Sequence, residues 1–384
     1  MVAAAVTVFG LAPRAWSQPV LLIDEQVIRA LPMVGSDPHP SGNSVQLSPD
    51  GKTLLYFEPV GDAPPGKPFD GPAQLVIRRL APGAGGEVME FRPDIGQPVL
   101  RDLLAVRGQP FSPDGKLLLL PDYHTRAKPG GGEKRRPILA CQTETGRIVR
   151  TGIEADIRYG RVDATNRLLL YLDGQAFSLE TGKRVREFGY MGIVEAANPR
   201  VPLLLVNTGK EGTPDTPDRV VIWNLREDRL LATLPTNFDH PWTDDVNPEW
   251  TRDGAYAYFI DVVAVTERDG VRDRIRYAKV WNAKTGQLVG RPFRAEVPLG
   301  LGPLPGTMFL RRRSDEGATE ILHHAESGAI AEIPEELGQV LAAMGDKIAF
   351  IKRIDGKPHL CVATLRWDLP DKPAPRGEPS PRRR

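Results

Sequence analysis

A short aromatic and acidic segment holds the side chains that are best suited to bind a ligand. Three carboxylates, two aromatic rings and a histidine fall within residues 238–245: Phe238, Asp239, His240, Trp242, Asp244 and Asp245. Carboxylates could hold a cation, and aromatic rings often dominate the binding energy of a protein interface. The Asp-x-Asp-x-Asp-Gly spacing of a calcium-binding loop is absent, so we assign no metal ligand here. The segment is expected either to contact a protein partner or to form an ordinary structured loop.

A second segment is basic and rich in glycine. It carries six candidate partner-binding residues on either side of the glycines at 130–132: Tyr123, His124, Arg126, Lys128, Arg135 and Arg136. Such a loop could bind an acidic partner, and the alternative is a solvated insertion whose charges aid solubility. The glycines do not form a phosphate-binding loop, because no Gly-Lys-[Ser/Thr] follows them and no helix is expected to start there.

Motifs for catalysis are lacking. The sequence has no Gly-x-Ser-x-Gly elbow, no Cys-x-x-Cys pair and no His-Glu-x-x-His zinc motif. Asp239 and His240 could supply two members of a catalytic triad with an unidentified serine, but six histidines in the chain make such neighbours a common coincidence. His323 and His324 lie in a predicted strand, where successive side chains point to opposite faces, so a structural role is expected. We therefore assign no catalytic, metal-binding or cofactor-binding residue.

Composition excludes several classes of protein. The 384 residues include 50 basic and 49 acidic side chains, a net charge of +1, so nothing indicates binding to nucleic acid or to an anionic membrane. Two cysteines, Cys141 and Cys361, are too few for a disulfide scaffold and lie in different units of the repeat described below. The 38 Gly and 37 Pro residues are spread along the chain, which is typical of many short strands and turns.

Those turns recur. Ser48–Lys52 and Ser112–Lys116 both read Ser-Pro-Asp-Gly-Lys, each precedes an apolar run, and Thr251–Gly254 is a copy without the proline. Proline presets the first corner of such a turn, aspartate bonds back onto it, and glycine takes the left-handed position. A second turn, of the form x-[Ser/Thr]-Gly, lies downstream in most repeats and ends at Gly146, Gly182, Gly286 and Gly328. Both turns join adjacent antiparallel strands.

The two turns divide the chain into seven units of four short strands. The units are residues 44–93, 100–152, 155–189, 192–235, 246–293, 297–334 and 339–367. The seventh unit lacks its last strand, and a spare strand, Glu25–Pro32, precedes the first, as the closing of a ring requires. We predict one all-β domain over residues 18–368, a seven-bladed β-propeller of four-stranded antiparallel blades closed by the N-terminal strand. Residues 369–384 are expected to be a disordered tail rich in proline and arginine.

These motifs carry a resemblance to known proteins. The Ser-Pro-Asp-Gly-Lys turns, with Val280-Trp281-Asn282 and the Thr285-Gly286 turn, resemble bacterial WD-repeat-like propellers and the propeller of the Tol–Pal envelope system. The resemblance covers about Val20–Asp368. Trp223-Asn224 and Trp281-Asn282 stand where strict WD repeats have Trp-Asp, so the buried His–Asp network of that family is not carried over. The resemblance implies a non-enzymatic scaffold that binds a protein partner on one face.

Long insertions fall at one end of the predicted blades. They join the second and third strands of a unit, at residues 58–73, 122–136, 207–219, 266–274 and 311–318. They also join the fourth strand of a unit to the first strand of the next unit, at residues 91–97 and 235–245. Because loops on a rigid scaffold tend to carry function, we expect the partner on this face. The alternative is a propeller hydrolase or lactonase at the mouth of the central channel. That enzyme would need ionisable side chains from at least three innermost strands, whereas those strands offer Val45, Leu47, Ala105, Val106, Leu341 and Ala342.

The N-terminus resembles a signal peptide. Val2–Leu11 is apolar, and Ala15-Trp16-Ser17 could be cleaved, so residues 1–17 are a candidate signal peptide. This predicts a periplasmic or extracellular protein, and the alternative is a cytoplasmic one because no Lys or Arg precedes the apolar run. No later segment is long and apolar enough to span a membrane. A monomer is expected.

Overall fold

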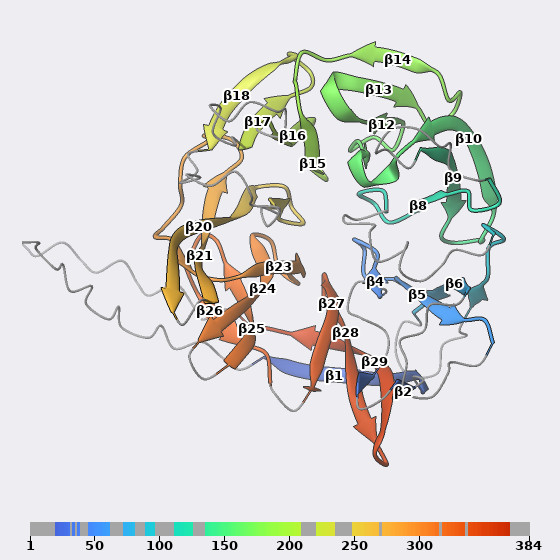
Figure 1. Cartoon of the computed structure of the whole chain (residues 1–384). Helices are drawn as coiled ribbons and strands as arrows, with labels where there is room; N and C mark the ends of the chain where they lie inside the picture. The colour runs from blue at the N-terminus through green and yellow to red at the C-terminus, as the bar shows by residue number, and fades with distance from the viewer. Residues whose placement is uncertain are drawn as a thin grey trace, which may run out of the picture.

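Seven small β-sheets are arranged in a ring around a central axis, and we call the region along this axis the channel (Figure 1). The computed structural model describes residues 20–30, 33–34, 37–38, 45–61, 72–80, 89–96, 111–125, 135–208, 220–234, 248–268, 271–314, 317–334 and 337–368. We number the sheets as blades 1 to 7 in chain order and name their strands A to D from the channel outward. The seven-bladed β-propeller of four-stranded antiparallel blades is therefore confirmed. The predicted signal peptide and C-terminal tail lie outside the described residues.

Blades 1 to 3 follow the predicted repeats. Blade 1 contains β4 (Gln46–Leu47), β5 (Thr53–Pro59), β6 (Ala73–Arg79) and β7 (Glu90–Phe91). Blade 2 contains β8 (Leu117–Pro121), β9 (Arg136–Gln142) and β10 (Ile148–Ala155), and Phe111 bridges Leu118 in the place of a strand A. Blade 3 contains β11 (Arg161–Val162), β12 (Leu168–Leu170), β13 (Gln175–Ser178) and β14 (Arg184–Glu187), with short 3-10 turns η2 (Ile157–Tyr159) and η3 (Leu172–Gly174).

Blades 4 to 7 complete the ring. Blade 4 contains β15 (Ile193–Ala197), β16 (Leu203–Asn207), β17 (Val220–Asn224) and β18 (Arg229–Leu234). Blade 5 contains β19 (Glu249–Trp250), β20 (Tyr256–Arg268), β21 (Val271–Asn282) and β22 (Phe293–Arg294). Blade 6 contains β23 (Val297–Leu301), β24 (Thr307–Ser314), β25 (Gly317–His324) and β26 (Ile330–Glu332). Blade 7 contains β27 (Gln339–Met344), β28 (Lys347–Ile354), β29 (Lys357–Arg366) and β1 (Leu21–Ala30), and β2 (Met33–Val34) pairs with β3 (Asp37–Pro38).

The A–B turns form as the sequence predicts. In blade 1 the Ser48 hydroxyl donates to Asp50, 2.6 Å away, and accepts the backbone N–H of Thr53 at 2.9 Å. Ser112 makes the same two bonds in blade 2, and Thr251 makes them in blade 5. These turns also touch across blades, because the Asn198 amide donates to the carbonyl of Gly254, 2.8 Å away. This bond links the A–B turns of blades 4 and 5.

The C–D turns are confirmed as well, with one shift of the strand that follows. Gly146, Gly182, Gly286 and Gly328 all have positive φ, and Asp228 takes the same conformation in blade 4, where the sequence has no glycine. In blade 5 strand D is β22, which begins seven residues after the turn that ends at Gly286, and Leu288 makes a single bridge to Trp281. Gly290, whose φ is 70°, takes the backbone out of the extended conformation between Leu288 and β22.

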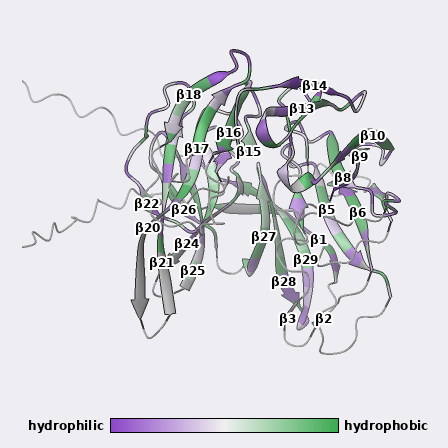
Figure 2. Ribbon diagram, turned by 45° about the horizontal axis from the view of Figure 1, so that its top comes forward, coloured by the Kyte–Doolittle hydropathy of each residue, from purple (hydrophilic) through white to green (hydrophobic). Residues whose placement is uncertain are grey.

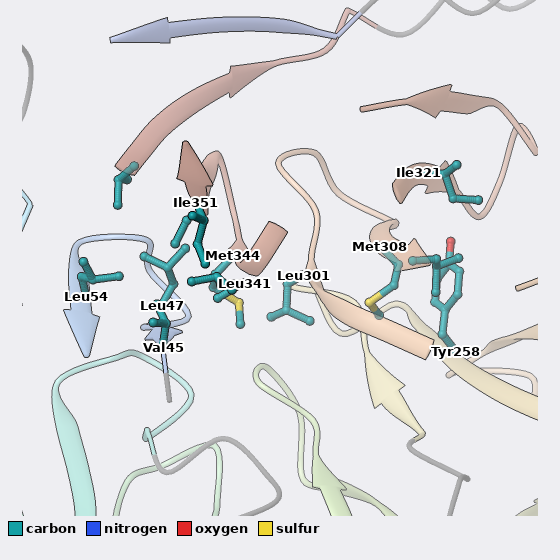
Figure 3. Close-up of a cluster of buried hydrophobic side chains, with 14 of the residues drawn as sticks. Val45, Leu47, Leu54, Tyr258, Leu301, Met308, Ile321, Leu341, Met344 and Ile351 are labelled. Carbon is teal, nitrogen blue, oxygen red and sulfur yellow. The ribbon is translucent and has the colours of Figure 1, made fainter. Parts of the chain in front are cut away.

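The hydrophobic core lies between neighbouring blades. Figure 2 shows hydrophobic residues on middle strands such as β16 and β17 and hydrophilic residues on the outermost strand β14, whose side chains are all exposed. The largest cluster joins blades 5, 6, 7 and 1, and Figure 3 shows Tyr258, Met308, Leu341, Met344 and Leu47 within it. Smaller clusters fill the interfaces between the other pairs of neighbouring blades. The packing thus joins each sheet face to face with the next one around the ring.

Two tryptophans and a histidine lie in these interfaces between blades. Trp281 is buried between blades 4 and 5, while Trp223 is partly buried between blades 3 and 4 and donates from its indole N–H to Asp228. His323 is buried and lies 2.7 Å from the hydroxyl of Tyr258, and its pKa is lowered to about 3, first by burial and then by His324. The neighbouring His324 contacts the hydroxyl of Ser327 in the turn that follows. Both cysteines are buried and neither forms a disulfide.

Strand β1 is the fourth strand of blade 7. It runs antiparallel to β29, from the pair Leu21–Arg366 to the pair Ala30–His359, so it begins and ends earlier than the predicted Glu25–Pro32. Its Ile28 side chain is buried in the cluster shared with blade 1, and Arg29 forms an ion pair with Glu58 of that blade. That this strand holds the ring closed stays a prediction, which is developed in the Discussion.

Two of the predicted long loops are strands instead. Residues 266–274 were expected to form a loop, but β20 and β21 stay paired as far as Arg268 and Val271. Residues 311–318 likewise belong to the hairpin of β24 and β25, which is paired to Ser314 and Gly317. Polar residues led to the loop assignment, yet a hairpin that reaches beyond the core can also carry polar residues on both faces. Of the residues described, none forms a helix long and apolar enough to cross a membrane.

Candidate functional site

A small cavity lies at the end of the channel where the A–B turns gather. Its volume is about 60 Å³, and three prolines of those turns line it: Pro49, Pro113 and Pro199. Strands A of three successive blades supply the polar part of its wall, namely Arg161 from blade 3, Glu195 from blade 4 and Glu249 from blade 5. Phe111, Trp250 and Leu301 are among its apolar walls.

A β-bulge directs Glu195 toward this cavity. The register of β15 against β16 shifts between Val194 and Ala196, so Glu195 is the extra residue of the bulge. Bulges leave backbone groups without partners in the ladder and turn a side chain away from the regular direction. Two neighbouring blades donate to the carbonyls at this point: Arg161 Nε lies 2.8 Å from the Glu195 oxygen, and Trp250 Nε1 lies 3.3 Å from the Ala196 oxygen. The bulge therefore ties blades 3, 4 and 5 together at the channel wall.

Arg161 is held on several sides. Besides its bond to blade 4, Arg161 Nη1 donates to the carbonyl of Gly160, 2.9 Å away. Burial lowers the pKa of Arg161, and the nearby Glu195 and Glu249 carboxylates act against that effect. The Glu195 carboxylate accepts a bond from the Asn207 amide at 3.3 Å. Both side chains are thus fixed in place by protein groups.

The Glu249 carboxylate has fewer hydrogen-bond partners. Its Oε1 accepts the backbone N–H of Trp250, 3.1 Å away, and among the residues that the structure describes no donor bonds to Oε2. Burial raises the pKa of Glu249 to about 7, against the lowering effects of the Trp250 N–H and Arg161. Shifted carboxyl groups in cavities are frequent at functional sites, because burial without a full set of partners disfavours the charge. Of the three ionisable groups that line this cavity, Glu249 is the carboxyl group whose pKa is raised.

The expectation that the innermost strands offer only apolar and small residues was wrong. It is correct for Val45, Leu47, Leu341 and Ala342, which are buried in the core of blades 1 and 7, and Ala105 and Val106 lie outside the described residues. In blades 3 to 5, however, Arg161, Glu195 and Glu249 each lie two or three residues before Asp163, Asn198 or Thr251, the first residue of an A–B turn. Aligning the repeats on that residue would have found all three.

The sequence-predicted partner residues lie at the opposite end of blade 2 where they are described. Arg136 stacks over the ring of Tyr123, 4.9 Å from its centroid, and donates to the carbonyl of Thr125. His124 Nε2 lies 2.8 Å from the Asp94 carboxylate, and the Tyr123 N–H donates to the Ile95 carbonyl at 2.8 Å. Arg135 is exposed beside them. We call Tyr123, His124, Arg135 and Arg136 the blade 2 cluster.

The remaining predicted partner residues are not described. Arg126 and Lys128 of the basic segment lie outside the described residues, as does the whole aromatic and acidic segment: Phe238, Asp239, His240, Trp242, Asp244 and Asp245. Within the part of the chain that the structure covers, no three His, Cys, Asp or Glu side chains come together as metal ligands.

Stability should depend on pH through Glu249. Its pKa lies near 7 in the folded protein and at 4.5 in a model peptide, so between these values the folded state binds the extra proton. The contribution of this group is therefore full below pH 4.5 and is lost as the pH rises through 7, by roughly 3 kcal/mol. We expect urea denaturation of the wild type to show this loss between pH 4.5 and 8, relative to Glu249→Gln. Parallel pH profiles for the two proteins would contradict the assignment.

Comparison with known proteins concerns the fold. No protein-family model and no curated protein matches the chain. Similar solved structures include the Pan2 WD40 domain of Neurospora crassa, with a TM-score of 0.47, 10% identity and coverage of 91% of this chain and 97% of that one. TolB from Acinetobacter baumannii has a TM-score of 0.38 and 11% identity, with coverage of 90% and 97%. The tricorn protease has a TM-score of 0.45 and 12% identity, and the match covers 88% of this chain but 34% of that one.

With TM-scores below 0.5, these similarities do not define the architecture. The β-propeller rests on the seven sheets described above. The more specific resemblance to WD-repeat-like and Tol–Pal propellers stays a prediction.

Proposed function

We propose that the protein is a non-enzymatic interaction module, which binds an acidic protein partner on the face formed by the B–C and D–A connections. The observation that supports this function is the blade 2 cluster. It combines an aromatic ring, a histidine and two arginines at the B–C end of the blade, next to the Asp94 and Ile95 segment that leads into blade 2. Tyrosine and arginine are enriched in the central contacts of protein interfaces.

The cluster is both ordered and accessible. The His124 side chain is 50% exposed, and its contact with Asp94 fixes the loop against the neighbouring segment. Tyr123 packs against the core of blades 1 and 2, which orients the Arg136 guanidinium that stacks on it. Arg150 of β10 adds a further positive charge with an 81% exposed side chain. Because these groups are held before binding, less conformational entropy is lost when a partner docks.

Charge reversal should show whether the partner binds to this face or to the opposite face. We expect Arg135→Glu with Arg136→Glu to weaken recovery of the partner at least tenfold in a cross-linked pull-down from the native host, because an acidic partner is then repelled. The matched control is Lys52→Glu with Lys116→Glu, which changes the net charge equally at two exposed A–B turn positions. Thermal melts would verify that both variants fold.

Three outcomes distinguish the possibilities. Loss of a specific protein with the arginine variant alone, together with stronger recovery by the wild type in low salt, supports the proposal. Equal recovery by both variants removes the blade 2 cluster from the interaction. Loss with the lysine variant alone would move the partner to the A–B turn face.

An enzyme is the second candidate, and a specific observation favours it. The cavity brings together three ionisable side chains from the strands A of blades 3, 4 and 5, which is the condition set above for a hydrolase in the channel. Glu249, with a pKa of about 7, could act as a general acid or base near neutral pH. Arg161 and the Glu195 carboxylate are already bonded to the protein, and a cavity of about 60 Å³ is small beside the several hundred cubic ångströms usual for organic ligands. The interaction module is therefore the function that we put first.

A further inference from the structure

The channel cavity has an acceptor that no described residue satisfies. Glu249 Oε1 takes the Trp250 N–H, while Oε2 has no bonded donor among the described residues, although the residue lines the cavity. Glu195 stands on the same wall, and its bulge position directs it there independently of Glu249. The cavity therefore presents carboxylate oxygens to whatever occupies it.

The site is built for a positive charge rather than a negative one. Arg161 would be the natural partner of an anion, but it already donates to the carbonyls of Glu195 and Gly160. With both carboxylates ionised, the cavity carries two negative charges and one positive charge. A single bound cation would neutralise the remaining negative charge. If that cation carries an N–H group, it would also donate a hydrogen bond to Glu249 Oε2.

We propose that this cavity binds a primary ammonium group, either of a small free amine or at the end of a lysine side chain or peptide N-terminus of a partner. An ammonium group has three N–H donors and can bond to both carboxylates at once. Phe111 and Trp250 line the same cavity, and apolar and aromatic walls suit the carbon atom next to the nitrogen. This inference goes beyond the partner-binding proposal, because the cavity lies at the opposite end of the channel from the blade 2 cluster.

Size and donor chemistry favour this group over other cations. A cavity of about 60 Å³ accepts a few water-sized groups, which matches methylammonium. A calcium ion requires six or more oxygen ligands, and the described residues contain no group of three metal-binding side chains. A quaternary ammonium ion is larger and has no N–H with which to bond to Glu249.

Binding should be coupled to the proton on Glu249. The pKa of this carboxyl group is raised to about 7, so a cation competes with the proton for the same site. We expect the affinity for methylammonium to fall about tenfold from pH 8 to pH 6, because the ionised fraction of a group with this pKa falls by that factor. If Glu249 had only a structural role, the affinity for methylammonium would not change with pH in this way.

The test is titration of the full chain with methylammonium chloride, followed by NMR or calorimetry at pH 6, 7 and 8. We expect saturable binding at pH 8 that Glu249→Gln weakens at least tenfold and that loses its pH dependence in this variant. The matched control is Glu144→Gln, which removes an exposed carboxylate in a C–D turn. Tetramethylammonium and acetate serve as the oversized cation and the anion, and thermal melts establish that each variant is folded.

Further titrations distinguish the sources of the ammonium group. Nα-acetyl-lysine methylamide carries a side-chain amine, and glycinamide carries a peptide-like N-terminus, so binding of one and not the other names the source. The proposal is overturned if methylammonium fails to saturate the protein, if it binds equally well to Glu249→Gln, or if acetate or tetramethylammonium binds as tightly. These results are independent of the pull-down, in which the variant with Arg135→Glu and Arg136→Glu is expected to lose the partner.

Discussion

A chain that lacks Leu21–Ala30 is expected to lose most of its resistance to unfolding. This deletion removes strand D of blade 7, so β29 would present an unpaired edge and blade 7 would lose its link to blade 1. Ile28 belongs to the same buried cluster as Leu54 and Tyr56 of blade 1 and Leu360 and Val362 of blade 7. Burial of that side chain alone is worth about 1.5–3 kcal/mol, and the backbone pairs and the ion pair of Arg29 with Glu58 add to it.

Thermal melting and urea denaturation would measure the effect, and two point variants of the same strand provide the control. Ile28→Ala is expected to cost about 2–4 kcal/mol, because it empties a buried site. Val27→Ala should cost under about 1 kcal/mol, because the Val27 side chain is 49% exposed. If the deleted chain melted with the full-length protein, the ring would not depend on the N-terminal strand, and the prediction of closure would be wrong.

Trp250→Ala is expected to destabilise the protein by about 3–5 kcal/mol. Trp250 is fully buried, and it belongs to the cluster that contains Leu205, Phe259 and Trp281 between blades 4 and 5. The substitution also removes the indole N–H that donates to the Ala196 carbonyl at the bulge of β15. The loss therefore combines a cavity in the core with an unpaired buried acceptor.

Trp250→Phe separates these two contributions. Phenylalanine keeps much of the ring volume but cannot donate to Ala196, so we expect a cost of about 1–3 kcal/mol from the unpaired acceptor and the smaller ring. Urea denaturation would provide both values. A cost below about 1 kcal/mol for Trp250→Ala would mean that neighbouring side chains refill the site, and that the contact between blades 4 and 5 does not depend on this residue.

Turn chemistry made the architecture predictable. The Ser48, Ser112 and Thr251 turns are held by bonds between residues at most five positions apart, so the local sequence is sufficient to specify them. The repeat of these turns indicated seven blades, and the spare strand near the N-terminus indicated where β1 would pair, although its ends differ by a few residues. His323 and His324 were also assigned correctly to opposite faces, because strand geometry alternates.

Strand lengths were harder to predict. Whether a polar segment such as 266–274 forms a loop or a hairpin depends on pairing with the strand beside it, and composition does not report that pairing. For the candidate partner site, the sequence indicated Tyr123, His124 and Arg136. It did not indicate that Asp94, thirty residues earlier than His124, would hold the histidine in place.

The sequence by itself determined the repeat, the turns and the number of blades, since each depends on contacts between near neighbours in the chain. The channel cavity was decided by the tertiary structure alone. Arg161, Glu195 and Glu249 belong to three different blades, and a one-residue bulge in β15 sets the direction of Glu195. Their meeting depends on how neighbouring sheets pack around the ring, and the raised pKa of Glu249 follows from the burial that this packing imposes.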